Sequence, residues 1–255
     1  MVLTPQTNTW VLLRGLSRER GHWGDFPVQL QAALPTCRVL MLVLPGNGSL
    51  YRQTSPVRIA DMVAHCRAAL TQQQLAPPFN LLAMSLGAMV AVAWANSHPQ
   101  EVAAQVLINT SLRPFSPFYQ RLRPSSYATL LRLALWERQP EVWERSIFGL
   151  TSRLASEKDT LPLWNALRAQ HPVRRINVLR QLLAAARFSA SLSAAPAPTL
   201  LLASAQDALV SVVCSQHLAR QWQCDLQIHP SAGHDLPLDD GPWVSAQISR
   251  WCSGA

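Results

Sequence analysis

The sequence predicts an α/β fold in which a mostly parallel sheet is covered by helices on both faces, with one helical insertion. Three observations lead to this prediction. Short apolar runs typical of buried strands alternate with helical stretches through most of the chain. That alternation stops between Asn109 and Pro196, where helix formers are broken by prolines. With 255 residues, 49% of them hydrophobic, the chain is long enough for one such domain and its insertion.

The individual elements can be placed in order along the chain. We expect strands over residues 10–14, 38–44, 79–84, 104–109, 199–203 and 225–228. Helices are expected over about 57–73, 86–97, 209–221 and 242–251, of which 86–97 is rich in alanine. The first strand starts close to Met1, so we expect no antiparallel hairpin before it. The sheet should then be a shortened one with an exposed edge near the N-terminus.

Ser85 is the most informative single residue, because it lies between the strand expected at 79–84 and the helix expected at 86–97. A sharp turn at such a junction lifts the serine hydroxyl out of the sheet, and it needs small residues two positions before and after the serine. Ala83 and Gly87 meet this need, although the first position is more often glycine. Ser85 is therefore a candidate nucleophile, although on its own it could be an ordinary helix N-cap.

An acid and a histidine follow the serine. Asp207 ends a hydrophobic strand, and His234 lies in a loop behind another short strand. The order serine, acid, histidine is that of the α/β-hydrolases and differs from two other arrangements found in serine proteases. Asp207 could instead cap the helix at 209–221. Three more acids compete with it, but one adjoins the histidine and two lie in a turn before a helix, which argues against them: Asp235, Asp239 and Asp240.

Three further segments complete a resemblance to the α/β-hydrolase family that runs over most of the chain. Residues 10–16 resemble the strand and loop of the family's oxyanion site, and residues 44–49 resemble its loop with two glycines around one variable residue. Residues 97–102, followed by the strand at 106–109, are similar to the stretch after the family's nucleophile helix. In size and layout the chain is also similar to carboxylesterases of the type that cleaves pimeloyl-carrier-protein methyl ester in the biotin pathway.

The resemblance implies a role for each residue of the site. Ser85 would attack a carbonyl carbon, His234 would act as base and then as acid, and Asp207 would orient the imidazole. The backbone N–H groups of Leu86 and Leu16 would hold the negative charge that forms on the carbonyl oxygen. Such a mechanism needs no cofactor and no metal ion.

Arg14 is the main departure from the family pattern. The family often has His-Gly at the end of the oxyanion strand, where this chain has Arg14-Gly15. Gly15 keeps the backbone freedom that lets an amide face the oxyanion. Arg14 could replace the structural hydrogen bonds of the histidine or pair with Glu19, and the sequence leaves both open. His22 and Trp23 lie near this loop and could line the substrate pocket.

Residues 111–195 are expected to form a helical cap on a core made of residues 1–110 and 196–255. This segment is rich in aromatic and leucine residues, and some of them must pack the cap onto the core. Together they are expected to roof an apolar pocket above Ser85 that suits an acyl chain or an aromatic acyl group. The predicted substrate-binding residues are Trp23, Phe115, Phe118, Trp136 and Phe148.

Arginine supplies almost all of the positive charge. The net charge is +8, and Lys158 is the only lysine. Arginine usage alone could reflect a GC-rich genome, but many arginines fall in the cap, where they could hold an anionic group. The family that the chain resembles includes esterases and thioesterases that act on acyl groups held by an acidic carrier protein, and the resemblance implies such a carrier as a partner. The candidate binding residues are Arg113, Arg121, Arg123 and Arg132. No nucleic-acid-binding motif or compact basic run accompanies the charge, so a nucleic-acid partner is not expected.

The sequence thus predicts a serine hydrolase that cleaves an ester or thioester of an apolar acyl group through an acyl-enzyme. The alternatives are a carbon–carbon bond hydrolase with the same triad and a catalytically silent scaffold that binds an acidic partner. A membrane-surface lipase would need an exposed apolar face on the cap, whereas the scattered arginines favour a polar outer surface. Five widely spaced cysteines indicate no disulfide framework or metal site. We expect a cytoplasmic protein without a signal peptide or membrane span.

Overall fold

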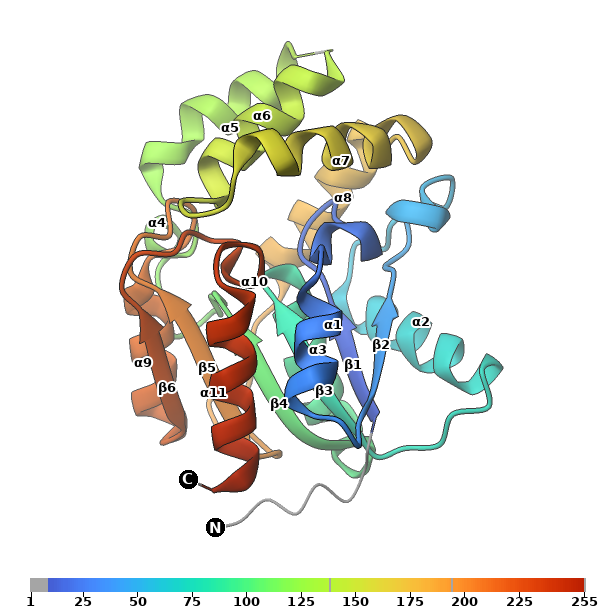
Figure 1. Cartoon of the computed structure of the whole chain (residues 1–255), viewed down its shortest axis with the longest axis vertical. Helices are drawn as coiled ribbons and strands as arrows, with labels where there is room; N and C mark the ends of the chain where they lie inside the picture. Colours follow the sequence, from blue (N-terminus) through green and yellow to red (C-terminus); the bar gives the residue numbers. More distant parts are fainter. Residues whose placement is uncertain (1–8, 138, 194, 255) are drawn as a thin grey trace.

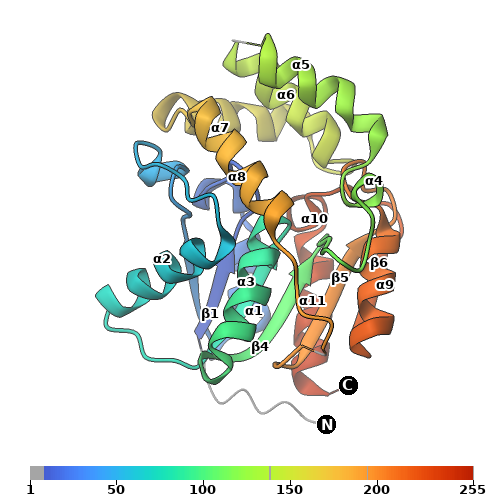
Figure 2. The same ribbon diagram turned by 180° about the vertical axis from the view of Figure 1, so that it is seen from behind.

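The structure is a computed structural model that describes residues 9–137, 139–193 and 195–254. A central sheet has helices on both faces, and a layer of further helices lies above one end of it (Figures 1 and 2). The α/β class with a parallel sheet is confirmed, and all six expected strands form, with ends within about two residues of the prediction. They are β1 (Thr9–Leu13), β2 (Arg38–Leu42), β3 (Phe79–Met84), β4 (Val102–Ile108), β5 (Thr199–Ser204) and β6 (Asp225–His229).

The strand order is β2-β1-β3-β4-β5-β6, and every neighbouring pair is parallel. The chain runs outward from β1 to β2 and then returns to the other side of β1 to form β3. In parallel α/β sheets such a reversal opens a crevice at the carboxyl ends of the two central strands, and ligands bind there. Because β1 pairs on both sides, the edge strand near the N-terminus is β2.

Alternating side chains of the strands form one core cluster on each face of the sheet. In β1, Trp10 and Leu12 point to one face, where α1 (Phe26–Ala33) and α11 (Gly241–Ser253) pack together. Val11 and Leu13 point to the other face. The helices on that second face are α2 (Ile59–Gln72), α3 (Leu86–Ser97) and α9 (Val212–Trp222). Burial on both faces explains why the four inner strands, β1, β3, β4 and β5, are nearly continuous apolar runs.

Four of the helices correspond to those expected from the sequence. They are α2, α3, α9 and α11, although α9 begins three residues later than expected because Asp207 holds residues 209 and 210 in a turn. Helix α1 and the short α10 (Leu236–Asp239) were not expected. Four 3₁₀ turns complete the core and the entry to the cap: η1 (Arg20–Trp23), η2 (Gly48–Leu50), η3 (Pro99–Glu101) and η4 (Pro124–Ser126).

Five helices between β4 and β5 form the layer above the carboxyl ends of the strands, and we call this layer the cap (Figure 1). All five fall within residues 111–195. They are α4 (Phe118–Arg121), α5 (Tyr127–Leu135), α6 (Pro140–Thr151), α7 (Glu157–Gln170) and α8 (Arg175–Arg187). A small third cluster, built around Phe148, Leu161 and Trp164, joins α6 to α7.

The expectation of a polar outer surface on the cap is wrong. Helix α5 buries Leu133 but leaves Leu131 and Leu135 exposed on its other side, and Leu179 of α8 is exposed as well. These helices pack on one side only, while their apolar residues occupy both sides. None of the helices among the described residues has the combination of length and apolar character that crossing a bilayer requires.

Candidate active site

Ser85 lies in the turn between β3 and α3 with φ 54° and ψ −116°. A non-glycine residue in such a conformation costs about 1–3 kcal/mol and needs support from its surroundings. The Ser85 N–H donates to the carbonyl of Ile108 at 3.0 Å, which ties the turn to β4. A Cβ on Gly87 would lie only 2.4 Å from the carbonyl oxygen of Leu13, so glycine is required for β1 to pack against the start of α3. The turn thus has the strained strand-to-helix geometry that the sequence predicts.

The loop that follows β1 packs directly against the serine. A Cβ on Gly15 would lie 3.2 Å from Ser85 Cβ and 3.7 Å from Ser85 Oγ. Among the described residues, neither the backbone N–H of Leu16 nor that of Leu86 has a hydrogen-bond partner. Two unpaired N–H groups therefore lie on the segments that flank the hydroxyl, as an oxyanion hole requires.

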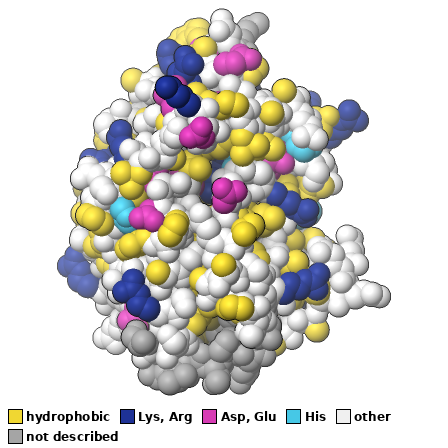
Figure 3. Space-filling view, in the orientation of Figure 1, with side chains coloured by type: hydrophobic (Ala, Val, Ile, Leu, Met, Phe, Trp, Pro, Cys, Tyr) yellow, Lys and Arg dark blue, Asp and Glu magenta, His cyan; other side chains and the backbone are white. Residues whose placement is uncertain are grey.

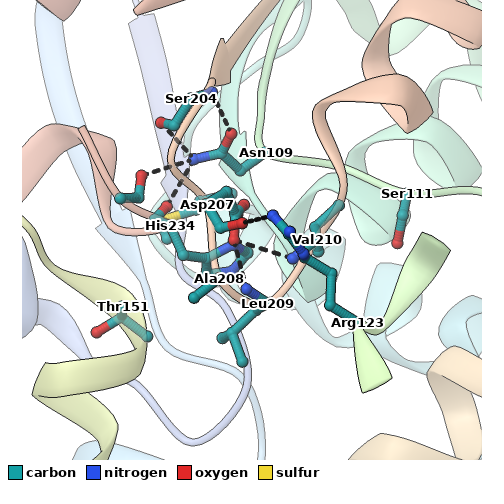
Figure 4. A network of polar contacts seen from close by, with 12 residues as sticks. Asn109, Ser111, Arg123, Thr151, Ser204, Asp207, Ala208, Leu209, Val210 and His234 are labelled. Atoms are coloured by element: carbon teal, nitrogen blue, oxygen red, sulfur yellow. Dashed lines mark hydrogen bonds and ion pairs between the residues drawn. The ribbon is translucent and has the colours of Figure 1, made fainter. Parts of the chain in front are cut away.

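His234 and Asp207 form a buried pair (Figure 4). His234 Nδ1 lies 2.7 Å from Asp207 Oδ2, and both side chains are almost fully buried. The other carboxylate oxygen accepts from the backbone N–H groups of Leu209 at 2.7 Å and Val210 at 2.9 Å. With both oxygens used, the carboxylate is fixed and the imidazole can present only Nε2 to a reactant. Ser85 Oγ makes no hydrogen bond among the described residues, and in enzymes without substrate such contacts are often long.

The other three acids near the histidine have different partners. Asp235 pairs with Arg14, and Asp240 lies 3.1 Å from His229 Nε2 and caps α11 through the N–H of Trp243. Asp239 accepts hydrogen bonds from the backbone N–H groups of Gly233 and of residues 153–155. Of the four candidates, only Asp207 contacts His234.

The charges around His234 favour its protonated form. Burial lowers the pKa of His234, but the negative charge of Asp207 and the hydrogen bond to it raise the pKa more. Asp235 adds to this increase and Arg14 opposes it, and the net effect is a pKa above the ordinary value. An imidazole in this environment binds a proton readily when a neighbouring hydroxyl gives one up.

Asn109 joins the ends of three segments at the site, a role that the sequence analysis missed (Figure 4). Its side-chain amide donates to the carbonyl of His234 at 2.7 Å and to Ser204 Oγ at 3.0 Å. Its carbonyl oxygen accepts from the Ser204 N–H at 2.8 Å. Asn109 has φ 46°, a conformation that asparagine tolerates better than most residues. An asparagine at the end of a buried strand was the available signal.

Arg14 pairs with Asp235 and not with Glu19. Its Nη1 lies 2.9 Å from Asp235 Oδ1 and its Nη2 lies 2.5 Å from Asp235 Oδ2, and the two side chains are 3% and 2% exposed. The guanidinium also lies 4.7 Å from the centroid of the Trp23 ring and donates to the sulfur of Met84, the residue before the serine. Arg14 therefore ties the oxyanion loop to the loop that carries His234 and to the end of β3.

A second buried ionic group ties the cap to the oxyanion loop. Glu144 of α6 accepts from Arg18 at 2.6 Å and from Arg168 of α7 at 2.9 Å, and its side chain is 2% exposed. The guanidinium of Arg18 also lies over the Trp164 ring at 3.9 Å. His22, close to Arg18, is buried, and burial followed by the charge of Arg18 holds its pKa well below the ordinary value. His22 is therefore neutral, and its contacts within this group are structural.

The five residues predicted to bind substrate have different environments. Trp23 is buried in the core against Phe26, and Phe115 packs on Trp222. Phe148 is buried between α6 and α7. Phe118 and Trp136 are 72% and 67% exposed on the outer surface. The structure does not bring these side chains together around Ser85.

The four arginines predicted to bind an anion all make hydrogen bonds within the protein. Arg113 donates to the carbonyl of Arg187, Arg121 to that of Ala185, and Arg123 to that of Asp207. Arg132 donates to Ser146 Oγ. These contacts join the first part of the cap to α8, to α6 and to the loop of the acid, and they do not form one cluster.

The comparison with family models agrees with this geometry, since the model described as Alpha/beta hydrolase family matches residues 10–247. The chain belongs to the alpha/beta hydrolase family. It is accordingly a hydrolase, with a family match that includes the serine turn, the cap and the histidine loop.

Individual relatives of this alpha/beta hydrolase are distant. A protein of Yersinia enterocolitica serotype O:8 / biotype 1B, named "Putative carbamate hydrolase RutD", is 27% identical over 224 residues, which cover 85% of this chain and 76% of that protein. A thermophilic esterase from Thermogutta terrifontis has a TM-score of 0.72 and 20% identity, covering 95% of this chain and 88% of the esterase. A hydrolase from Pseudomonas aeruginosa PA01 has a TM-score of 0.74 and 18% identity, covering 99% and 92%. At such identities the two structures show a shared fold.

Proposed function

We propose that this alpha/beta hydrolase is a serine hydrolase that cleaves a carboxylic ester or thioester of an apolar acyl group through an acyl-enzyme intermediate. One observation carries the proposal. The buried pair of His234 and Asp207 lies at the same edge of the sheet as Ser85, which occupies a strained turn in contact with Gly15. Nucleophile, base and orienting acid are the three parts that such chemistry needs.

Each step uses an atom whose environment favours it. Ser85 Oγ attacks the carbonyl carbon while His234 Nε2 takes its proton, and Asp207 stabilises the imidazolium. The N–H groups of Leu16 and Leu86 stabilise the oxyanion, and one such donor contributes about a hundredfold or more in rate. His234 then gives its proton to the leaving oxygen or sulfur, and water hydrolyses the acyl-enzyme by the reverse sequence.

The preference for an apolar acyl group follows from the charges near the serine. Two buried pairs lie on the segments around Ser85, His234 with Asp207 and Arg14 with Asp235. With each charge already paired, binding a charged acyl group would bury a further charge without a partner, which is costly. An apolar acyl group carries no such cost.

Other substrate classes can be tested together with simple esters. An acyl group linked to an acidic carrier protein, as in the pimeloyl-carrier-protein methyl ester type of carboxylesterase, is the form that the net charge favours. A carbamate is the form that the name of the Yersinia relative favours, since its carbonyl can be attacked in the same way. Hydrolysis of a carbon–carbon bond with the same triad is the remaining alternative.

The proposal is tested by hydrolysis of p-nitrophenyl esters from acetate to dodecanoate, of matching acyl-coenzyme A thioesters and of an aryl carbamate. Ser85→Ala should lose activity on every substrate that the wild type cleaves and should no longer be labelled by a fluorophosphonate. Ser97→Ala, at the other end of the same helix and exposed, is the matched control and should keep full activity. The acyl-chain length that gives the highest kcat/KM would indicate the size of the acyl-binding site.

Failure to label Ser85 and failure to cleave any of these substrates would contradict the proposal. That result would favour the catalytically silent scaffold instead. Activity that survives in Ser85→Ala would contradict the role of the serine even if the protein is a hydrolase.

A further inference from the structure

The exposed apolar side chains of this protein are concentrated in the cap. Fifteen large hydrophobic side chains among the described residues are exposed, and thirteen of them lie in residues 111–195, which are only a third of the chain. The other two are Val28 and Ile228 in the core domain. Scattered apolar residues are normal on a surface, but concentration in one region marks a site of interaction.

Exposed apolar side chains follow the helical repeat on two helices of the cap, α5 and α8. Tyr127, Leu131 and Leu135 are four residues apart on α5, and Ile176, Leu179 and Leu183 are three and four apart on α8, so each set occupies one side of its helix. Trp136, which follows the last residue of α5, is exposed as well. An Arg175 hydrogen bond to the carbonyl of Glu137 joins the end of α5 to the start of α8. Both helices lie on the near side of the cap in Figure 2.

The cap also carries the entire net charge of the protein. Residues 111–195 contain thirteen arginine and lysine residues and five aspartate and glutamate residues, an excess of eight. The rest of the chain contains nine basic and nine acidic residues and is neutral overall. Figure 3 shows the opposite face, where basic, acidic and hydrophobic side chains are interspersed at the cap end of the molecule. A surface that is both cationic and apolar is the composition of helices that bind at a membrane interface.

The positive charge of the cap indicates which kind of partner binds this surface. A second copy of the chain would bring two cationic caps together, which like-charge repulsion opposes. An acidic protein would be held best by arginines that converge on one site. The partners of Arg113, Arg121, Arg123 and Arg132 lie on separate segments of the protein, so these arginines do not converge. What remains is a diffuse positive field around exposed apolar side chains. Anionic lipid headgroups over an apolar interior complement both properties.

We propose that the cap surface formed by α5 and α8 binds to the surface of a lipid bilayer that contains anionic headgroups. The apolar side chains of α5 enter the boundary between headgroups and acyl chains, while the arginine guanidinium groups remain at the level of the headgroups. The binding is peripheral and needs no spanning helix. It places the cap, and the carboxyl ends of the strands below it, toward the membrane.

Sedimentation with vesicles tests the proposal. The two vesicle types are phosphatidylcholine alone and equal parts of phosphatidylcholine and phosphatidylglycerol. The wild type should bind the second type more tightly than the first, and added salt should weaken this binding. Leu131→Ser/Leu135→Ser removes two side chains that are 55% and 53% exposed, so the fold should be kept, and vesicle binding should fall by roughly tenfold or more.

Two control variants separate this proposal from the others. Val28→Ser removes an even more exposed apolar side chain, 72% exposed, from the core domain and should bind vesicles like the wild type. Ser85→Ala should also bind like the wild type, so loss of hydrolysis would not bear on this result. No binding of the wild type to anionic vesicles, or equal binding by Leu131→Ser/Leu135→Ser, would overturn the proposal. Capture of an acidic acyl carrier protein without vesicle binding would overturn it too.

Discussion

The buried pair of Arg14 and Asp235 gives a prediction whose magnitude follows from the structure. Removing one partner from a buried, bidentate ion pair leaves the other charge without a counterion, which typically costs about 3–5 kcal/mol. The two side chains are 3% and 2% exposed, so water cannot replace the missing partner. We expect Arg14→Met and Asp235→Asn each to lower the free energy of unfolding by about this amount.

The double variant makes the prediction specific. Arg14→Met/Asp235→Asn leaves no unpaired charge, so its loss should be smaller than the sum of the two single losses by at least about 2 kcal/mol. Urea unfolding at pH 7 measures all four proteins. Arg145→Met is the matched control, because the Arg145–Glu157 pair is exposed at 71% and 52% and should contribute less than about 1 kcal/mol. Additive losses in the double variant, or a loss in Arg14→Met no larger than in the control, would refute the reasoning.

The same variants should move the pH dependence of activity in opposite directions. Arg14 lowers the pKa of His234 and Asp235 raises it. Since the base must be neutral to accept a proton, activity is lost as the pH falls below the pKa of His234. Arg14→Met should therefore move the acid limb of kcat/KM to higher pH and Asp235→Asn should move it to lower pH. Two shifts in the same direction would show that the pair acts on His234 only through structure.

Three further predictions use other features of the site. Asp207→Asn removes the charge that holds up the pKa of His234, so the acid limb should move to lower pH and kcat should fall on the order of 10⁴-fold; unchanged kinetics would exclude this acid. Gly87→Ala should prevent folding or lower the melting temperature sharply, because the added Cβ would lie 2.4 Å from a backbone oxygen of β1. Gly149→Ala is the control: no atom lies within 4 Å of the added Cβ, so this variant should stabilise α6 by up to about 1 kcal/mol in thermal unfolding. Glu144→Gln should leave two partly buried arginines without their buried counterion, lower the free energy of cap opening by about 3 kcal/mol and speed limited proteolysis within residues 111–195 by roughly a hundredfold. Equal proteolysis rates in Glu144→Gln and the wild type would show that this contact does not hold the cap.

The sequence was most informative where local pattern and topology agree. The four inner strands could be located because burial on both faces makes each a nearly continuous apolar run, whereas the edge strands β2 and β6 are partly exposed. Ser85, Asp207 and His234 each follow a strand of a parallel sheet, and the carboxyl ends of such strands meet at one edge, so their proximity could be expected from order alone. The Ser85 turn also has a local signature in its small neighbours.

Long-range polar contacts could not be predicted. Arg14 and Asp235 are separated by 221 positions, and nothing near either residue indicates the other. The prediction that aromatic residues of the cap line one substrate pocket did not follow from the sequence for a different reason. Phe118, Trp136 and Phe148 have similar hydrophobicity, but their exposure depends on which side of each helix meets the core, and the cap packs partly through polar groups such as Glu144. Composition alone does not determine that side.

Asp239 makes the cap and the histidine loop parts of one cooperative unit. Its carboxylate accepts from the N–H of Gly233, next to His234, and from the backbone N–H groups of residues 153–155 at the start of the turn between α6 and α7. A cap movement that withdraws this turn must break several hydrogen bonds on the same carboxylate that holds the histidine loop. The free energy of opening is thus linked to the free energy of ordering His234, and linkage is reciprocal. Any molecule that binds the closed cap more tightly than the open one therefore also increases the population of proteins in which His234 is ordered.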